Sequence, residues 1–250
     1  MKITVVIPTY NESENLPRLV AVLFSLPLDL RVLVVDDNSP DGTGAVAEEL
    51  VRQHARRVSV LHRSAKQGLR TAYLEGFKTA LQTGAEAIVQ MDADFSHDPT
   101  VLVAMSERLS SCDLVLGSRY VNGGSVDGRW PFWRKGLSAF GNFYARTILH
   151  LPLRDVTTGY RMWRRETLEG MPFARVKANG YIFQVELAYM AYCLKYKVGE
   201  VPIYFADRRW GKSKMSFKIQ AEAALRVWQV LWDYRDLKRM GKTARVKSVV

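Results

Sequence analysis

Two aspartates, Asp92 and Asp94, flank Ala93 directly after an apolar run of the chain. Two carboxylates in one short loop can share a divalent cation with the diphosphate of a substrate, and Mg²⁺ and Mn²⁺ favour such oxygen ligands. About one D-x-D triplet is expected by chance in a chain of this length, and such a triplet would simply cap a helix. The place of this triplet at the end of an apolar run favours the metal site.

A second acidic pair, Asp36 and Asp37, ends another apolar run. Asp37 can accept hydrogen bonds from a nucleotide's base or ribose, as acidic residues do at this place in nucleotide-binding α/β folds. Asp41 is the better cap for the following helix, which predicts that Asp37 is free for a ligand. The chain has neither a G-x-G-x-x-G after its first apolar run nor a P-loop, so a nucleotide would be held by side chains.

Four cations are candidates for binding phosphate, because guanidinium and ammonium groups match phosphate oxygens. They are Arg119, Arg134, Arg208 and Lys214. Arg208 and Lys214 lie in one short loop, which suits a mobile lid that closes over a phosphate. The histidines have no ligand spacing and no Ser/His/Asp arrangement stands out, so nucleophilic hydrolysis is disfavoured.

The first half of the chain alternates short apolar runs with segments of helical periodicity. We expect buried strands at 3–7, 32–35, 58–61, 87–91 and 114–116, with helices at 13–24, 41–54, 69–82 and 100–109. This rhythm predicts an α/β fold, mainly a parallel sheet with helices on both faces. Ligands bind beyond the carboxyl ends of such strands, where the polar residues above are found. Further on, we expect a helix at 180–194 and a strand at 198–205.

The chain has 250 residues and a formal charge of +11, and residues 201–250 hold 12 Lys and Arg against 4 Asp and Glu. Apolar residues at helical spacing over 216–239 predict an amphipathic helix. Nucleic acid, anionic lipid and phosphorylated substrates all fit this basic segment, as does a merely solvated tail.

Membrane spans and disulfides are not expected. We find no signal peptide and no run of roughly 18 apolar residues. Cys112 and Cys193 lie in apolar segments, which indicates reduced thiols and a cytoplasmic protein.

In combination, the segments around these residues resemble family 2 glycosyltransferases, most closely the dolichyl- or polyprenyl-phosphate mannosyltransferases, across nearly the whole chain. The motifs are VVIPTYNESENLP at 5–17, VVDDNSPDGT at 34–43, KQGLRTAY at 66–73, MDADFSHDP at 91–99, GSRY at 117–120, TGYR at 158–161, GEVPI at 199–203 and FADRRWGKSKM at 205–215. The resemblance implies a GT-A type nucleotide-sugar-binding domain over 1–215, followed by a basic amphipathic helix and tail over 216–250.

The resemblance also implies substrates and residue roles. GDP-mannose would be the donor, dolichyl or polyprenyl phosphate the acceptor, and Mg²⁺ or Mn²⁺ the cofactor. The donor site would comprise Pro8, Tyr10, Glu12, Val35, Asp37, Asp92, Ala93, Asp94, Arg119, Arg208 and Lys214. Metal binding would fall to Asp92 and Asp94, catalysis to these two with Arg208 and Lys214, and the acceptor phosphate to Arg119, Arg134 and Ser138.

This sequence departs from relatives in places. Arg70 stands where relatives can have glycine, which would reshape the rim of the donor site, and Ala139 replaces an arginine of some members. Many members carry C-terminal membrane helices that we do not find here. We therefore expect a peripheral protein on the cytoplasmic face of a membrane, held by its basic amphipathic tail or by a membrane-anchoring subunit.

The expected acceptor suggests a mechanism. A phosphate monoester has a second pKa of about 6, so its oxygen can attack the sugar without a catalytic base, in one displacement with inversion. Transfer of glucose or an N-acetylhexosamine from a UDP-sugar to the same lipid is the alternative within enzymes. A non-catalytic basic module on a membrane or nucleic acid is the alternative of another class, although we find no nucleic-acid-binding motif and expect no nucleic acid partner.

Overall fold

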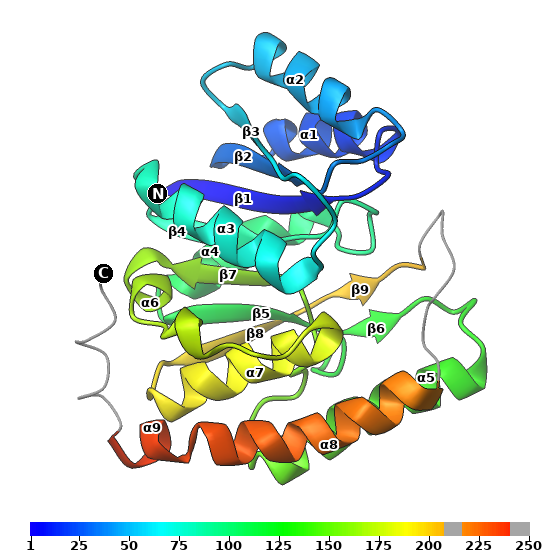
Figure 1. The fold of residues 1–250 in the computed structure, drawn as a ribbon, viewed down its shortest axis with the longest axis vertical. Helices are drawn as coiled ribbons and strands as arrows, with labels where there is room; N and C mark the ends of the chain where they lie inside the picture. Colours follow the sequence, from blue (N-terminus) through cyan, green and yellow to red (C-terminus); the bar gives the residue numbers. More distant parts are fainter. Residues whose placement is uncertain (208–216, 241–250) are drawn as a thin grey trace.

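A computed structural model describes residues 1–207 and 217–240 of the chain, with the side chains of 1–207 and 224–239. Within these residues the centre of the molecule is a seven-stranded sheet, with the strands in the order β3-β2-β1-β4-β7-β5-β8 (Figure 1). The strands are β1 (Lys2–Thr9), β2 (Asp29–Asp36), β3 (Val58–His62), β4 (Ala87–Gln90), β5 (Leu114–Ser118), β7 (Arg161–Arg164) and β8 (Val198–Pro202). A short parallel ribbon joins β6 (Ser125–Val126) to β9 (Tyr204–Phe205).

The sheet is parallel except at β7, which pairs antiparallel with both β4 and β5. The carboxyl ends of the other six strands therefore meet at one edge, and this edge also receives the start of β7. The predicted parallel sheet is confirmed. The strand β7 was not predicted, because its four residues, Arg-Met-Trp-Arg, are too few and too polar at both ends to give a periodic signal.

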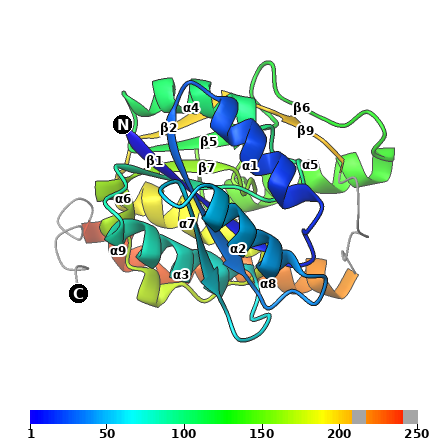
Figure 2. The ribbon, with the colours of Figure 1, turned by 90° about the horizontal axis from the view of Figure 1, so that it is seen from above.

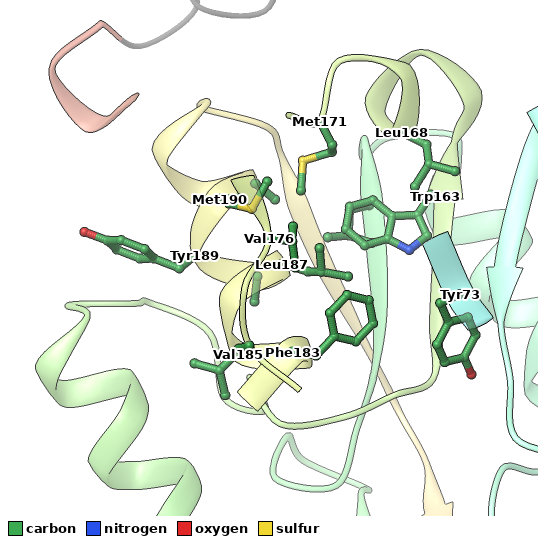
Figure 3. Close-up of a cluster of buried hydrophobic side chains, with 14 of the residues drawn as sticks. Tyr73, Trp163, Leu168, Met171, Val176, Phe183, Val185, Leu187, Tyr189 and Met190 are labelled. Carbon is green, nitrogen blue, oxygen red and sulfur yellow. The ribbon is translucent and has the colours of Figure 1, made fainter. Parts of the chain in front are cut away.

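Helices cover both faces of the sheet (Figure 2). On one face lie α1 (Asn15–Ser25), α2 (Thr43–Gln53) and α4 (Leu102–Leu109), and on the other lie α3 (Leu69–Gln82) and α7 (Gly180–Cys193). Alternate residues of β1 divide between the two cores, since Val5 and Ile7 pack under the first group and Val6 under the second. Figure 3 shows part of the second core, which includes Phe183 of α7 and Trp163 of β7.

Further helices surround this layer. They are α5 (Phe132–Ile148), α6 (Arg165–Glu169), α8 (Phe217–Asp233) and α9 (Arg235–Met240), with short turns η1 (Pro99–Val101) and η2 (Phe173–Arg175). The predicted helix at 180–194 is α7, and it is buried all round because α3 and the sheet lie on one side and α8 and α9 on the other.

The C-terminal helices are fixed to the body by a buried tyrosine. Tyr234, between α8 and α9, is wholly buried and donates to Glu186 Oε1 and to the carbonyl of Arg175, both at 2.9 Å. Glu186 also accepts the N–H of Ala178 at 2.8 Å. The amphipathic segment predicted at 216–239 is therefore two helices, α8 and α9, and both pack against α7. No helix within the described residues combines the length and apolarity needed to cross a bilayer.

One predicted strand is corrected by the structure. The segment 198–205 was expected to be continuous, but it forms β8 and β9, which belong to different sheets and are separated by Ile203. The N–H of Ile203 donates to the carbonyl of Ser118 at 3.0 Å, and its side chain is buried. The chain therefore bends away from the main sheet at this residue, beside the carboxyl edge.

Candidate active site

The D-x-D loop follows β4 at the carboxyl edge of the sheet. Asp92 and Asp94 are half-buried on either side of the buried Ala93. The hydroxyl of Tyr73 donates to Asp92 Oδ1 at 3.3 Å, and the N–H of Ser96 donates to Asp94 Oδ1 at 3.0 Å. Phe95 has a φ of 59°, a left-handed conformation that is costly for this residue and is common at functional loops.

Tyr73 reaches Asp92 from the hydrophobic core. Its ring stacks near Phe77 and Phe183, and Figure 3 shows its hydroxyl pointing away from that cluster. Burial, with the nearby charge of Asp92, raises the pKa of Tyr73 well above its ordinary value. Tyr73 is therefore protonated at neutral pH and donates to one carboxylate of the D-x-D pair.

This donor set suits one kind of metal. Within the described residues no group of three or more His, Cys, Asp and Glu is placed to hold an ion. Asp92 and Asp94 alone leave most positions of an octahedral ion to water and substrate oxygens, and Mg²⁺ is commonly bound in this way between carboxylates and phosphates. The pair thus fits an ion shared with a substrate and does not fit a structural zinc site.

The residues predicted to bind a nucleoside gather at the ends of β1 and β2. Pro8 and Val35 are paired in the parallel register, and Val35 is fully buried. Tyr10 is 37% exposed with Lys66 Nζ 3.4 Å from its ring centroid. The N–H of Glu12 donates to Thr43 Oγ1 at 2.9 Å, and its carboxylate accepts from Asn15 at 2.8 Å.

Asp37 lies beside this group, but it is not free as predicted. It forms a buried ion pair with Arg63, which follows β3. Arg63 is 3% exposed and also donates to Thr71 Oγ1 at 2.7 Å and to Glu75 Oε2 at 3.2 Å. Burial raises the pKa of Asp37 despite the opposing charge of Arg63. The arginine was missed because it looks like an ordinary strand-end residue. Asp41 accepts from the N–H of Thr43, the first residue of α2, but the capping position of this helix is Gly42 and not Asp41 as predicted.

Arg119, which is predicted to contact phosphate, forms an ion pair with Asp155. Its Nε and Nη2 donate to Asp155 at 2.7 and 2.9 Å, and Nη2 also donates to Thr157 Oγ1 at 2.6 Å. The side chain is 9% exposed and Asp155 is fully buried. Two nitrogens of the guanidinium are thus paired with Asp155, and the phosphate contacts of Arg119 stay a prediction.

Arg134 lies at the start of α5. Its guanidinium stacks on Trp130, 3.8 Å from the ring centroid, and Nη1 donates to Asp207 at 2.9 Å. The side chain is 25% exposed. Ser138, one turn further along α5, shares a hydrogen bond of 2.9 Å with the hydroxyl of Tyr120. The predicted acceptor residues Arg134 and Ser138 therefore lie on one helix, while Arg119 is held separately by Asp155.

A cavity of about 300 Å³ lies beside the D-x-D loop. Its lining comprises Asp94, Phe95, Asp98, Pro99, Asp127, Arg129, Tyr204, Ala206 and Asp207. Its lining therefore includes one aspartate of the D-x-D pair and Asp207, the ion-pair partner of Arg134. Arg208 and Lys214, predicted to act on the leaving group, lie outside the described residues.

A buried cation lies beneath the loop. Arg161 begins β7, is fully buried and pairs in register with Gln90 of β4, two residues before Asp92. It donates to the carbonyls of Thr158 at 3.0 Å and Gln184 at 2.7 Å. Burial lowers the pKa of Arg161 to about 9, so it remains charged at neutral pH. The sequence motif TGYR contains this residue but gave no sign of its burial.

The sequence of this chain is similar to those of known glycosyltransferases. The family model described as Glycosyl transferase family 2 matches residues 4–171. The chain is 44% identical over 247 residues to the polyprenol monophosphomannose synthase of Mycolicibacterium smegmatis, covering 98% of this chain and 90% of that protein. It is 43% identical over 227 residues to the undecaprenyl-phosphate mannosyltransferase of Micrococcus luteus, covering 91% of this chain and 93% of that one.

Solved structures support the fold. The structure of glucosyl-3-phosphoglycerate synthase from Mycobacterium tuberculosis with Mn²⁺, UDP and glucosyl-3-phosphoglycerate has a TM-score of 0.62. It shares 17% identity and covers 92% of this chain and 78% of that one. The same enzyme with Mn²⁺, UDP and phosphoglyceric acid gives a TM-score of 0.63. The predicted GT-A arrangement of sheet and helices is confirmed by this likeness.

Proposed function

The chain belongs to glycosyl transferase family 2, and we propose that it transfers mannose from GDP-mannose to a polyprenyl phosphate with inversion. The enzyme class follows from the family, and the lipid acceptor and the sugar are those in the names of its relatives. The guanosine donor rests on the resemblance of the sequence motifs to mannosyltransferases.

The observation that carries the proposal is the cavity between Asp94 and the Asp207–Arg134 ion pair. A donor diphosphate near Asp92 and Asp94 and an acceptor phosphate at Arg134 would meet across it. Its volume of about 300 Å³ leaves room for a single sugar between the two phosphates. A polar, aromatic lining suits sugar hydroxyls and the apolar face of the ring.

The metal role falls to Asp92 and Asp94, with Mg²⁺ or Mn²⁺ as the ion. When bound there, the ion would neutralise charge on the departing diphosphate. Tyr73 and the N–H of Ser96 hold the two carboxylates in place before substrate arrives, so little reorganisation is needed on binding. Arg208 and Lys214 remain proposed partners of the same diphosphate.

The chemical step needs no general base. The acceptor phosphate is largely a dianion above its second pKa of about 6, and Arg134 would orient it bidentately. Asp207 occupies Nη1 of Arg134 at 2.9 Å, so the phosphate would replace a carboxylate at the same donor. Because the attacking oxygen enters opposite the diphosphate, one displacement inverts the anomeric centre.

The acceptor brings the protein to a membrane, and two neighbouring helices offer the contact. Exposed apolar residues recur at helical spacing on α5 and on α8: Phe132, Trp133, Phe140 and Phe143, then Leu225, Trp228 and Trp232. The helices lie side by side, since Trp228 Nε1 donates to the hydroxyl of Tyr144 at 2.9 Å. Lys135, Arg146 and Arg226 lie among them, which suits an anionic lipid surface.

We therefore propose a peripheral enzyme on the cytoplasmic face of a membrane, with a catalytic domain over 1–215 and a lipid-binding segment over 216–250. A membrane-anchoring subunit would add to this contact.

The test is transfer of labelled sugar into polyprenyl phosphate in detergent, using GDP-mannose, UDP-glucose and UDP-N-acetylglucosamine with Mg²⁺ or Mn²⁺. We expect label in lipid from GDP-mannose alone, and none after chelation. Asp94→Asn should abolish transfer, whereas Asp29→Asn should retain it, because Asp29 is exposed at the start of β2, at the opposite edge of the sheet from the D-x-D loop. Label from a UDP-sugar would contradict the donor, and no label from any donor would contradict the acceptor.

A further inference from the structure

His97 is a buried ring in the metal loop that the reaction scheme does not use. It is 1% exposed, and its Nδ1 accepts the backbone N–H of Asp92 at 3.1 Å. This hydrogen bond joins the last residue of the SH pair in MDADFSHDP to the first aspartate of the D-x-D pair. The ring thus closes the loop on itself.

The C-terminal end of the loop is fixed by Tyr160, which stacks on His97. The ring stacks on Tyr160, with centroids 4.8 Å apart and an interplanar angle of 15°. The hydroxyl of Tyr160 donates to the carbonyl of Asp98 at 3.0 Å. Residues 92–98, which include Phe95 in its left-handed conformation, are therefore held at both ends by one pair of stacked rings.

The other side of His97 faces the acceptor residues. Its ring meets Phe205 edge to face, with centroids 5.7 Å apart at 71°. Phe205 meets Trp130 in the same manner at 5.8 Å and 79°, and Arg134 lies 3.8 Å above the Trp130 centroid. A continuous series of ring contacts thus runs from the metal loop to Arg134.

A proton-transfer role for His97 is disfavoured by the same geometry. The nitrogen Nδ1 is already bonded to a backbone N–H, and the ring has almost no exposed surface. The acceptor phosphate also requires no base. What remains is the control of position, and active sites depend on placing reacting groups within a fraction of an ångström.

We propose that His97 is a positioning residue that fixes the D-x-D carboxylates and Arg134 relative to one another. The Nδ1 atom acts on the metal loop, and the ring acts through Phe205 and Trp130 on the acceptor arginine. The inference rests on the proposed function, because its first half needs metal-dependent binding of GDP-mannose at the D-x-D pair and its second half needs the polyprenyl phosphate acceptor.

Two variants separate these halves. His97→Phe keeps a ring but removes the acceptor atom, and His97→Asn keeps an acceptor near the Nδ1 position but removes the ring. With GDP-mannose and no lipid, we expect His97→Phe to raise the half-saturating Mn²⁺ concentration for nucleotide binding about tenfold, the equivalent of one hydrogen bond. His97→Asn should stay within about twofold of the wild type in this measurement.

The KM for the acceptor tests the second half of the proposal. In the transfer assay, His97→Asn should raise the KM for polyprenyl phosphate about fivefold, since the ring contacts toward Arg134 are lost. His97→Phe should leave this KM within about twofold. If His97→Phe does not fold, His97→Gln is measured instead, because its oxygen falls nearer the Nε2 position than Nδ1.

Trp163→Phe is the matched control. It too keeps a buried ring and loses one hydrogen bond, the one from Nε1 to Gln90 at 2.8 Å, but it lies outside the metal loop. The proposal is overturned if Trp163→Phe shifts the Mn²⁺ requirement as much as His97→Phe, or if neither His97 variant differs from the wild type. Absence of GDP-mannose binding by the wild type would refute the proposed donor, whereas absence of lipid labelling by a wild type that binds Mn²⁺ and GDP-mannose would refute the proposed acceptor and leave the metal measurement valid.

Discussion

Asp155 and Arg119 form a two-pronged ion pair, with Nε and Nη2 of the arginine 2.7 and 2.9 Å from the two carboxylate oxygens. Asp155 is fully buried and also accepts the N–H of Arg119 at 3.0 Å. The pair therefore ties the end of β5 to the segment that leads into β7, and this holds the acceptor side of the site to the sheet.

Breaking this pair should be costly. Asp155→Asn leaves Arg119 buried without its carboxylate, and removal of one partner of a buried pair typically costs about 3–5 kcal/mol. Urea unfolding of the two proteins measures the difference. Glu49→Gln, which disrupts an exposed pair with Arg52, should leave the unfolding curve unchanged. Equal effects of the two substitutions would count against a structural role for Asp155.

The same pair predicts an acid dependence of stability. Burial alone would raise the pKa of Asp155, but Arg119 holds it below the ordinary value of 3.8. A depressed folded-state pKa contributes stability above the unfolded value, and this stability is lost as the pH falls through the folded pKa. We expect the wild type to lose unfolding free energy below pH 3.8 more steeply than Asp155→Asn, as measured by urea unfolding at a series of pH values.

Arg63 should govern nucleotide binding without touching the nucleotide. Arg63→Lys keeps the charge but cannot reach Asp37, Thr71 and Glu75 together, so Asp37 loses its fixed position. We expect the Kd for GDP, measured by calorimetry, to rise about tenfold, the equivalent of 1.4 kcal/mol. Arg52→Lys on the exposed face of α2 is the control, and an unchanged Kd for both would refute the role.

Arg134 should affect the acceptor and spare the donor. Arg134→Ala removes the proposed phosphate contact, and we expect the KM for polyprenyl phosphate to rise at least about tenfold with the KM for GDP-mannose within twofold. Asp207→Asn removes the competing charge at 2.9 Å and should lower the acceptor KM. A rise in the KM for GDP-mannose alone would contradict the proposal that Arg134 binds the acceptor.

The aromatic residues of α5 should carry membrane binding. Trp133 is 69% exposed and Phe140 is 63% exposed. Burial of an aromatic side chain in lipid contributes about 1.5–3 kcal/mol, so Trp133→Ser with Phe140→Ser should reduce sedimentation with anionic vesicles at least about tenfold. Tyr204→Ser, an equally simple loss of an exposed ring away from these helices, should not. Unchanged vesicle binding by the double variant would contradict the proposal that the aromatic residues of α5 bind the membrane.

Much of the fold could be predicted from the sequence because its strands are local signals. Runs such as Val32–Leu33–Val34–Val35 are buried on both faces and are bounded by polar turns, which marks β2 and its neighbours. The D-x-D pair was found by its place after such a run. The strand β7 was not predicted, because a short strand that is held in place by β4 and β5 leaves no periodic pattern in the sequence.

The partners of the site residues could not be predicted. Arg63 meets Asp37 from 26 positions along the chain, and Asp155 meets Arg119 from 36. An arginine or aspartate of this kind has the same local sequence signal whether it binds substrate or a buried partner. Only the three-dimensional arrangement distinguishes a charged side chain that is open to a ligand from one that is already paired, as Asp37 with Arg63 and Arg119 with Asp155 illustrate.

The reversed strand β7 has a consequence for how the protein is made. β4 and β5 are joined through α4 but do not pair with each other, and the place between them is filled by β7. Until residues 161–164 leave the ribosome, β4 has an unpaired edge directly below the D-x-D loop. Pairing of strands that are far apart in the sequence is slow, and until β7 is inserted the unpaired edge of β4 can pair with strands of other chains. A nascent chain stalled before residue 161 should therefore be prone to aggregation and unable to bind nucleotide, even though it already contains both metal-binding aspartates.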